Sequence, residues 1–261
     1  WLNMVIDDLG LTVSRNEYYP PGDGSCDFAK QAPFLKALKA KADASGEPLT
    51  FLVSYWSPPA AWKSNHSTIN GGTLLPEYYA DFGNYAAHTA YQYDSIGVGL
   101  YGLSPQNEPA FVEPYNSCVY TAEEYVAMTK VLGPMVHATY PQLVIFSAED
   151  MLSRWSTPGT YLGPLMADQV TRDEVGALAV HDYHSDGVSP TPTSESAMYW
   201  SRAARNCTGV GKPLWMTETS GQTNSWSGAL QLAMSMYAAL YYGHVSMWVW
   251  WQLGNSSPSS G

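Results

Sequence analysis

Short runs rich in β-branched and aromatic residues alternate with longer stretches of helical periodicity along most of this chain. The helical period is clearest at residues 34–40, where apolar side chains recur three and four positions apart. Consecutive parallel strands need a crossover between them, which is usually a helix. The alternation therefore predicts an α/β fold with a parallel sheet.

Strands are predicted at residues 11–16, 49–55, 97–104, 143–147, 176–181, 212–217 and 245–251. Helices are predicted at residues 28–45, 76–93, 122–140, 161–171, 194–207 and 227–242. Thr121 with Glu124 three residues later predicts an N-terminal cap for the third helix. Seven strands are one fewer than a (β/α)8 TIM barrel contains. We expect the first barrel strand to be missing from this chain; the alternative is that residues 1–6 supply it.

Length and composition predict one large globular domain at residues 1–253, followed by a Ser/Gly/Pro-rich linker or tail at 254–261. Apolar residues make up 45% of the chain and charged residues 13%, which argues against disorder. The net charge of −11 disfavours a nucleic-acid partner, and no apolar run approaches the length of a membrane span. No signal peptide is visible. We expect a monomer.

Long connections rich in Pro, Asn, Gly and Ser follow the predicted strands, at residues 57–75, 110–120, 149–160 and 185–193. The turns that lead from a helix into the next strand are short. Barrel enzymes place their active sites on the loops that follow the strands. The sequence therefore predicts one functional face, at the carboxyl ends of the strands.

Two glutamates, Glu108 and Glu218, each come where a short apolar run ends. Hydrolysis of a glycosidic bond with retention needs one carboxylic acid that protonates the leaving oxygen and one carboxylate that attacks the anomeric carbon. The pair is therefore predicted to be catalytic. Glu149 is a third strand-end carboxylate, predicted to bind substrate and the chief rival for either role.

Further polar candidates surround this pair. Asn107 could hydrogen-bond a substrate hydroxyl. Two interpretations of Arg15 stay open: it stabilises the charge of the nucleophile, or it forms a buried structural ion pair. His181 and His184 lack further ligands at a telling spacing, and the three cysteines show no metal-like spacing, so neither a metal nor another cofactor is expected.

The chain contains 10 Trp and 19 Tyr, and such amphipathic rings stack on sugar faces. Trp56, Trp250 and Trp251 are the candidate sugar platforms. Side chains alternate along a strand, so Trp250 and Trp251 should point to opposite sides, and at least one of them should be structural.

Four blocks in order along the chain resemble glycoside hydrolase family 30: Trp-Ser-Pro-Pro-Ala at 56–60, Gly-Gly-Thr-Leu at 71–74, Ser-Pro-Gln-Asn-Glu-Pro at 104–109 and Trp-Met-Thr-Glu-Thr-Ser at 215–220. The resemblance implies a (β/α)8 barrel and a retaining mechanism. It makes Glu108 the acid/base and Glu218 the nucleophile. It also implies that His181 and Tyr183 line the site, with the tyrosine hydroxyl donating to the nucleophile. The chain departs from the family pattern because it lacks the opening strand and the accompanying β-sandwich domain.

The resemblance further implies a secreted hydrolase of β-linked polysaccharide. Endo-acting hydrolysis of xylan is the nominal expectation, and β-1,6-glucan, β-1,6-galactan and glucosylceramide are the alternative substrates. Few basic residues fall on the predicted active-site loops (Lys63, Arg154 and Arg202), which tilts the interpretation away from a charged substrate. A non-catalytic carbohydrate-binding barrel is the rival class; such a protein would keep the aromatic residues but need neither glutamate.

Overall fold

The computed structural model describes residues 12–20, 28–155, 160–183 and 193–251 of the chain. Its strands are β1 (Val13–Tyr18), β2 (Thr50–Tyr55), β3 (Gly102–Ser104), β4 (Val144–Met151), β5 (Val175–His181), β6 (Leu214–Glu218) and β7 (Met247–Trp248). Its α-helices are α1 (Phe28–Ser45), α2 (Tyr79–Ser95), α3 (Ala122–Thr139), α4 (Leu152–Trp155), α5 (Leu162–Ala167), α6 (Gln169–Glu174), α7 (Ser194–Gly209) and α8 (Trp226–Tyr241).

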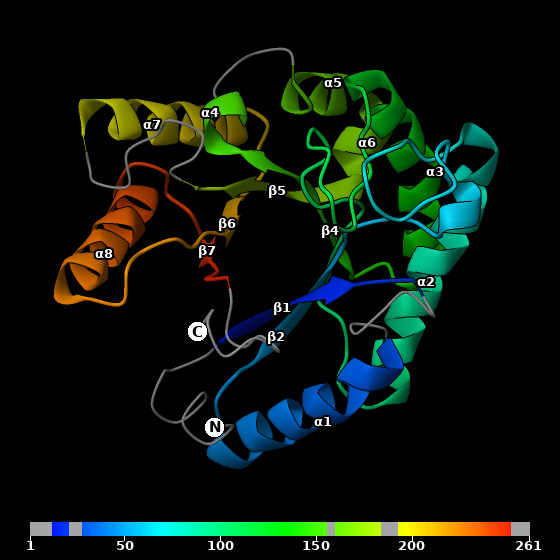
Figure 1. The fold of residues 1–261 in the computed structure, drawn as a ribbon, viewed down its shortest axis with the longest axis horizontal. Coiled ribbons are helices and arrows are strands. Elements are labelled where there is room, and N and C mark those ends of the chain that lie inside the picture. Colours follow the sequence, from blue (N-terminus) through cyan, green and yellow to red (C-terminus); the bar gives the residue numbers. More distant parts are fainter. Residues whose placement is uncertain (1–11, 21–27, 156–159, 184–192, 252–261) are drawn as a thin grey trace.

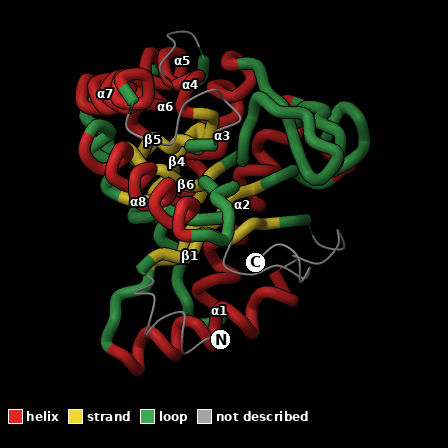
Figure 2. The backbone as a smooth tube through the Cα atoms, turned by 60° about the vertical axis from the view of Figure 1, so that its left-hand side comes forward, coloured by secondary structure: helices red, strands yellow, loops and turns green. Residues whose placement is uncertain are grey.

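The seven strands form one parallel sheet in sequence order, from β1 to β7. The sheet curls, and the helices lie on its outer side while the strands occupy the centre (Figures 1 and 2). This is the arrangement of a (β/α) barrel, so the predicted α/β class and parallel sheet are confirmed. The predicted cap of α3 is also confirmed, because Thr121 Oγ1 accepts from the Glu124 amide and Glu124 Oε2 accepts from the Thr121 amide.

Alternation along the strands gives the sheet two apolar faces. On β5, Leu178 and Val180 belong to the large core between the sheet and the helices. Ala177 and Ala179 belong to a smaller cluster inside the curl, with Leu52, Phe146 and Trp215. Side chains fill the interior of small barrels in the same way. Trp215 thus packs inside the curl at the start of β6, whose last residue is Glu218.

The first and last strands, β1 and β7, do not pair with each other within the described part of the chain. A cavity of about 330 Å³ lies between them, lined by Thr12, Val13, Pro48, Thr50, Ser246, Met247 and Trp248. Nearer the carboxyl ends a side-chain bond spans the two edges, because Trp251 Nε1 donates to Glu17 Oε1 over 2.9 Å. The expectations for residues 1–6 and 254–261 lie outside the described residues.

Three predicted elements differ clearly from the structure. The strand predicted at 97–104 is reduced to β3, Gly102–Ser104. The helix predicted at 161–171 is divided into α5 and α6, because Asp168 is extended and its carboxylate caps α6 by accepting from the amides of Val170 and Thr171. The strand predicted at 245–251 is paired only at Met247–Trp248. Among the described residues, no helix combines the length and apolar character that crossing a membrane requires.

The loops at the carboxyl ends of β2 and β3 support each other. Residues of the first loop pair with residues of the second at the isolated bridge between Ile69 and Asn116. The side chain of Lys63 is fully buried between the two loops, where its Nζ donates to Ser57 Oγ over 3.0 Å and to the Ser117 carbonyl over 2.5 Å. Gly72 has a positive φ of 75°, and a Cβ there would lie 2.4 Å from the Asn65 side chain, so this turn requires glycine.

Candidate active site

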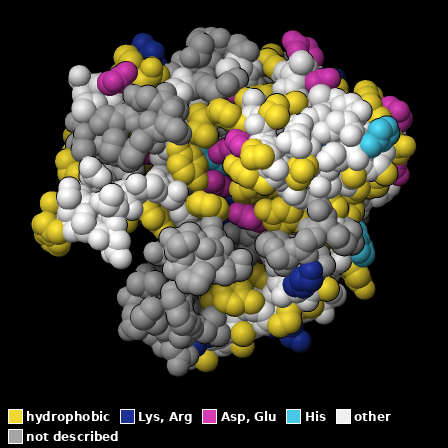
Figure 3. Space-filling view, in the orientation of Figure 1, with side chains coloured by type: hydrophobic (Ala, Val, Ile, Leu, Met, Phe, Trp, Pro, Cys, Tyr) yellow, Lys and Arg dark blue, Asp and Glu magenta, His cyan; other side chains and the backbone are white. Residues whose placement is uncertain are grey.

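Five strands bring polar side chains together at the carboxyl end of the sheet. Arg15 lies on β1, Glu149 on β4, and His181 and Glu218 are the last residues of β5 and β6. Glu108 follows β3. Acidic side chains gather in a central hollow of this face (Figure 3). The carboxyl ends of parallel strands meet at one edge, which is why residues far apart in the sequence converge here.

The Glu218 carboxylate accepts a hydrogen bond on each oxygen. Tyr183 Oη donates to Oε1 over 2.5 Å, and Arg15 Nη1 donates to Oε2 over 2.8 Å. The side chain of Glu218 is 5% exposed. Hydrogen bonds and a positive charge at both oxygens favour the ionised form of a carboxylate. The geometry thus suits a carboxylate that must remain charged.

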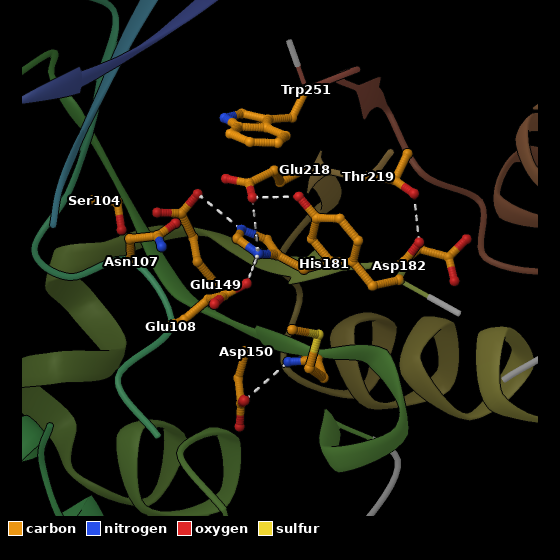
Figure 4. Close-up of polar contacts among 12 residues, drawn as sticks. Ser104, Asn107, Glu108, Glu149, Asp150, His181, Asp182, Glu218, Thr219 and Trp251 are labelled. Atoms are coloured by element: carbon orange, nitrogen blue, oxygen red, sulfur yellow. Dashed lines mark hydrogen bonds and ion pairs between the residues drawn. The ribbon is translucent and has the colours of Figure 1, made fainter. Parts of the chain in front are cut away.

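Glu108 has a different environment. Its Oε1 lies 2.8 Å from His181 Nδ1, and its side chain is 12% exposed, more than the side chains of Glu149 and Glu218. The same nitrogen of His181 lies 4.0 Å from Glu218 Oε1. His181 therefore lies between the two glutamates (Figure 4).

Arg15 connects three side chains of the site. Besides its bond to Glu218, its Nε donates to Glu149 Oε1 over 2.8 Å and its Nη2 donates to Asn107 Oδ1 over 2.6 Å. Because Arg15 occupies the amide oxygen of Asn107, the amide nitrogen is the group that Asn107 presents to a substrate hydroxyl. Both earlier interpretations of Arg15 apply at once, since it makes a buried ion pair with Glu149 and also contacts Glu218.

Glu149 has no exposed side-chain surface. Its Oε1 lies 2.8 Å from Arg15 Nε and 3.6 Å from His181 Nε2. The buried position of Glu149 favours a role in holding Arg15 and His181. It does not favour the predicted contact with substrate.

The backbone at two of the glutamates is unusual. Glu108 has a φ of 45° and Glu149 a φ of 52°, both in the left-handed region that costs a non-glycine residue about 1 kcal/mol or more. Glu149 also lies in a β-bulge of β4, and a second irregularity separates Val180 from His181 on β5. Bulges re-aim side chains at the rims of barrels and next to active sites. Local backbone distortion thus turns these side chains towards the centre.

Burial and neighbouring charges together set the pKa values of the site residues. Burial alone would lower the pKa of His181, but Glu218, Glu108 and Glu149 outweigh it and raise this pKa to about 10. Burial alone would raise the pKa of Glu149, but Arg15 and His181 lower it to about 2. Burial and the charge of Glu218 raise the pKa of Tyr183. At neutral pH Arg15 and His181 are therefore positive, Glu149 is negative, and Tyr183 keeps the proton that it donates.

The raised pKa of His181 predicts a pH dependence of stability. Its folded pKa lies above the value of about 6.5 for an unfolded chain, so its stabilising contribution is complete below about pH 6.5 and is lost as the pH rises through about 10. We expect His181→Gln to lower the free energy of unfolding by on the order of 1 kcal/mol or more at pH 6, and by less at pH 10. Urea unfolding at pH 6, 8 and 10 measures this difference.

His88→Gln is the matched control, because His88 is exposed on α2 and lies outside the site. We expect only a small difference from wild type, because this exposed side chain makes no contact with the site. A pH-independent cost of His181→Gln would contradict the charge assignment of this residue.

The aromatic candidates occupy different environments. Trp56 is 7% exposed and packs against Tyr115 and Tyr19, with ring centroids 5.5 and 6.2 Å away. Trp250 is 37% exposed and stacks on Trp248 at 6.4 Å. The indole of Trp251 lies over Glu218 (Figure 4). Of the three, Trp251 is therefore best placed to face a sugar bound at the glutamates.

Glu108, His181 and Glu218 each offer one potential metal-ligand atom, and these atoms lie within 4.8 Å of one another. A metal-binding imidazole must be neutral. The raised pKa of His181 keeps it protonated at neutral pH, and Arg15 adds a second positive charge beside Glu218. The electrostatics of the site thus oppose a cation at this position.

Glu17 and Tyr19 also belong to the site, although neither was predicted from the sequence. Both lie near the carboxyl end of β1, where Glu17 accepts hydrogen bonds from Trp251 and from Tyr19. The period of two along a strand places residues 15, 17 and 19 on one side, so the selection of Arg15 could have led to them.

No family model matches the chain. Three curated relatives do, and two of them follow. "Putative glucosylceramidase 4" of Caenorhabditis elegans is 26% identical over 245 residues, which cover 86% of this chain and 44% of the relative. "Glucuronoxylanase XynC" of Bacillus subtilis (strain 168) is 24% identical over 217 residues, 78% of this chain and 46% of the relative. The chain thus spans about half the length of these relatives.

Among solved structures, the glycoside hydrolase family 30 subfamily 8 xylanase Xyn30A from Clostridium acetobutylicum superposes with a TM-score of 0.79. The sequences are 23% identical, and the match covers 97% of this chain and 60% of the xylanase. This likeness supports the barrel fold. Together with the curated relatives, it confirms the resemblance to glycoside hydrolase family 30 that the four sequence blocks predicted.

Proposed function

We propose that this chain carries the active site of a retaining glycoside hydrolase that cleaves β-linked polysaccharide. One observation carries the proposal: oxygens of Glu108 and Glu218 lie within 4.8 Å of each other. Retaining glycosidases hold their two carboxyl groups about 5–5.5 Å apart, whereas inverting enzymes leave about 6.5–9.5 Å for a water molecule. The spacing favours direct attack by one carboxylate.

The contacts assign the two roles. Tyr183 and Arg15 hold both oxygens of Glu218, which suits the nucleophile that attacks the anomeric carbon. His181 donates to Oε1 of Glu108, so Oε2 is the oxygen that can carry a proton to the leaving group. Bond formation from Glu218 and proton transfer from Glu108 then release the first product. Glu108, now ionised, takes a proton from the water that hydrolyses the glycosyl-enzyme and frees Glu218.

The charges of the cluster support this assignment. Arg15 and His181 contribute two positive charges, and Glu149 and Glu218 contribute two negative charges. A protonated Glu108 leaves this buried cluster neutral, whereas an ionised Glu108 adds an uncompensated negative charge. Glu149 therefore acts as a positioning residue, whose charge balances the two cations that hold Glu108 and Glu218.

We further propose endo-acting hydrolysis of xylan as the nominal activity. The names of the glucuronoxylanase and xylanase relatives support it, although this chain spans only part of each. A β-1,6-glucanase, a galactanase and a glucosylceramidase-like hydrolase are the alternatives. A non-catalytic carbohydrate-binding barrel is the rival class, but it gives no reason for the bonded set of Arg15, His181, Tyr183 and the glutamates.

A panel of defined β-linked oligosaccharides tests the proposal. We expect at least one neutral oligosaccharide to be cleaved, with the products identified by mass. Proton NMR of the first minutes should show the new reducing end in the β configuration. Binding without cleavage would favour the rival class, and an α product would contradict retention.

A further inference from the structure

Glu17 lies one step further out on the strand that carries Arg15. Residues 15 and 17 point to the same side of β1, because side chains alternate along a strand. Arg15 donates to Glu218 from this side of the strand. Glu17 is two positions nearer the carboxyl end, which is the side where substrate enters a barrel. It is half-buried.

Glu17 fixes the position of Trp251. The indole Nε1 donates to Glu17 Oε1 over 2.9 Å, while the backbone amide of Trp251 donates to the carbonyl of Thr219 over 2.9 Å. Thr219 directly follows Glu218. The ring is therefore held at both ends over the Glu218 carboxylate (Figure 4).

The second oxygen of Glu17 is also occupied. Tyr19 Oη donates to Oε2 over 2.8 Å, and the Tyr19 ring packs on Trp56 at 6.2 Å. One carboxylate thus connects Trp251 with Tyr19 and, through the Tyr19 ring, with Trp56. Bonds that lock a side chain in place are what a preorganised sugar site requires.

Basic residues are scarce at this end of the sheet. Nine of the twelve lie on helices α1, α3, α6 and α7 or in the turn before β6: Lys30, Lys36, Lys39, Lys41, Lys130, Arg172, Arg202, Arg205 and Lys212. Arg15 is bound to two carboxylates, and Lys63 is fully buried on loop oxygens. The remaining basic residue, Arg154, has a side chain outside the described part of the structure. Among the described residues, a uronic acid bound in the hollow would therefore meet the charge of Glu17 with no further Lys or Arg at this end.

We propose that Glu17 is a positioning and specificity-determining residue of the site, which holds Trp251 over Glu218 and selects neutral β-glycans over glycans that carry uronic acid. The inference rests on the proposed function and narrows its substrate class. It separates this chain from the relative named a glucuronoxylanase.

The test uses the neutral oligosaccharide that wild type cleaves fastest and its counterpart that carries one glucuronic acid. Glu17→Gln keeps an oxygen for the Trp251 indole but removes the charge, whereas Glu17→Ala removes both. We expect each variant to lower the preference for the neutral substrate by about 10-fold in kcat/KM, because each removes the like-charge repulsion. On the neutral substrate, Glu17→Ala should lower kcat/KM about 10-fold more than Glu17→Gln, since it alone releases Trp251.

Glu47→Gln is the matched control, because Glu47 is exposed in the turn before β2, at the opposite end of the sheet. It should leave both rates as in wild type. An unchanged preference for the neutral substrate in both Glu17 variants would overturn the specificity role. If Glu17→Gln and Glu17→Ala lost equal kcat/KM on the neutral substrate, the positioning role would be overturned. Faster cleavage of the uronic-acid substrate by wild type would overturn the inference alone. Cleavage of no oligosaccharide by wild type would overturn the proposed function and the inference with it.

Discussion

Glu218→Gln should lower kcat by roughly 10⁴-fold or more while the protein stays folded. The amide is close in size to the carboxylate; its oxygen can still accept the hydrogen bond from Arg15, and its nitrogen can donate to the Tyr183 hydroxyl. It cannot attack an anomeric carbon, so the covalent intermediate does not form. Initial rates on the oligosaccharide of the panel that wild type cleaves fastest measure the loss of kcat. Circular dichroism shows whether the variant stays folded.

Glu108→Gln provides the comparison, because it removes the acid but not the nucleophile. We expect a loss of roughly 10²–10⁴-fold on natural linkages. The loss in the first step should be small for an aryl glycoside whose leaving group needs no proton. Glu218→Gln should be inactive on both kinds of substrate. A Glu218→Gln variant with near-normal turnover would contradict the role of this residue.

Arg15→Met should give the largest loss of stability among the site variants. Arg15 and Glu149 form an ion pair with side chains 3% and 0% exposed, and removal of one partner leaves a buried charge without compensation. Such a loss typically costs about 3–5 kcal/mol. We expect this reduction in the free energy of unfolding at neutral pH, measured with urea.

The second variant, Glu149→Gln, distinguishes the cost in stability of the uncompensated buried charge from the cost of lost packing. In the Arg15→Met background it removes the uncompensated carboxylate, so the double variant should be more stable than Arg15→Met alone. Lys39→Met is the control for loss of a cation, since Lys39 pairs with Asp43 on the exposed side of α1 and should contribute about 0.5 kcal/mol or less. A further loss of stability in the double variant would contradict the charge argument.

Much of the fold follows from local pattern. Helix α1 was predicted with its observed bounds, Phe28–Ser45, because apolar side chains recur at helical spacing in residues 34–40. The division between α5 and α6 was missed, since an internal Asp can either continue a helix or cap a new one and only its backbone conformation decides. The predicted last strand was too long because only Met247 and Trp248 pair in register with β6, although Val249 and Trp251 still donate backbone hydrogen bonds to Met216 and Thr219.

The sequence indicated which strand-end residues form the site, but it did not indicate how their side chains are arranged. Glu108 and Glu218 could be selected because each ends an apolar run. The buried position of Glu149 could not, because it depends on a bulge and a positive φ that shift the alternation locally. The bond between Glu17 and Trp251 joins the two ends of the chain, so no local pattern contains it. Contacts of this kind require the three-dimensional sheet.

The central claim is that Glu218 forms a covalent bond with the sugar. The fluorine of a 2-deoxy-2-fluoro glycoside destabilises the electron-poor transition states of both steps and slows them. A good leaving group restores the first step, so the covalent intermediate accumulates. Mass spectrometry of the treated protein should show one added sugar, and peptide mapping should place it on Glu218. A label on Glu108 or Glu149, or turnover of natural substrate with no label at all, would contradict the account.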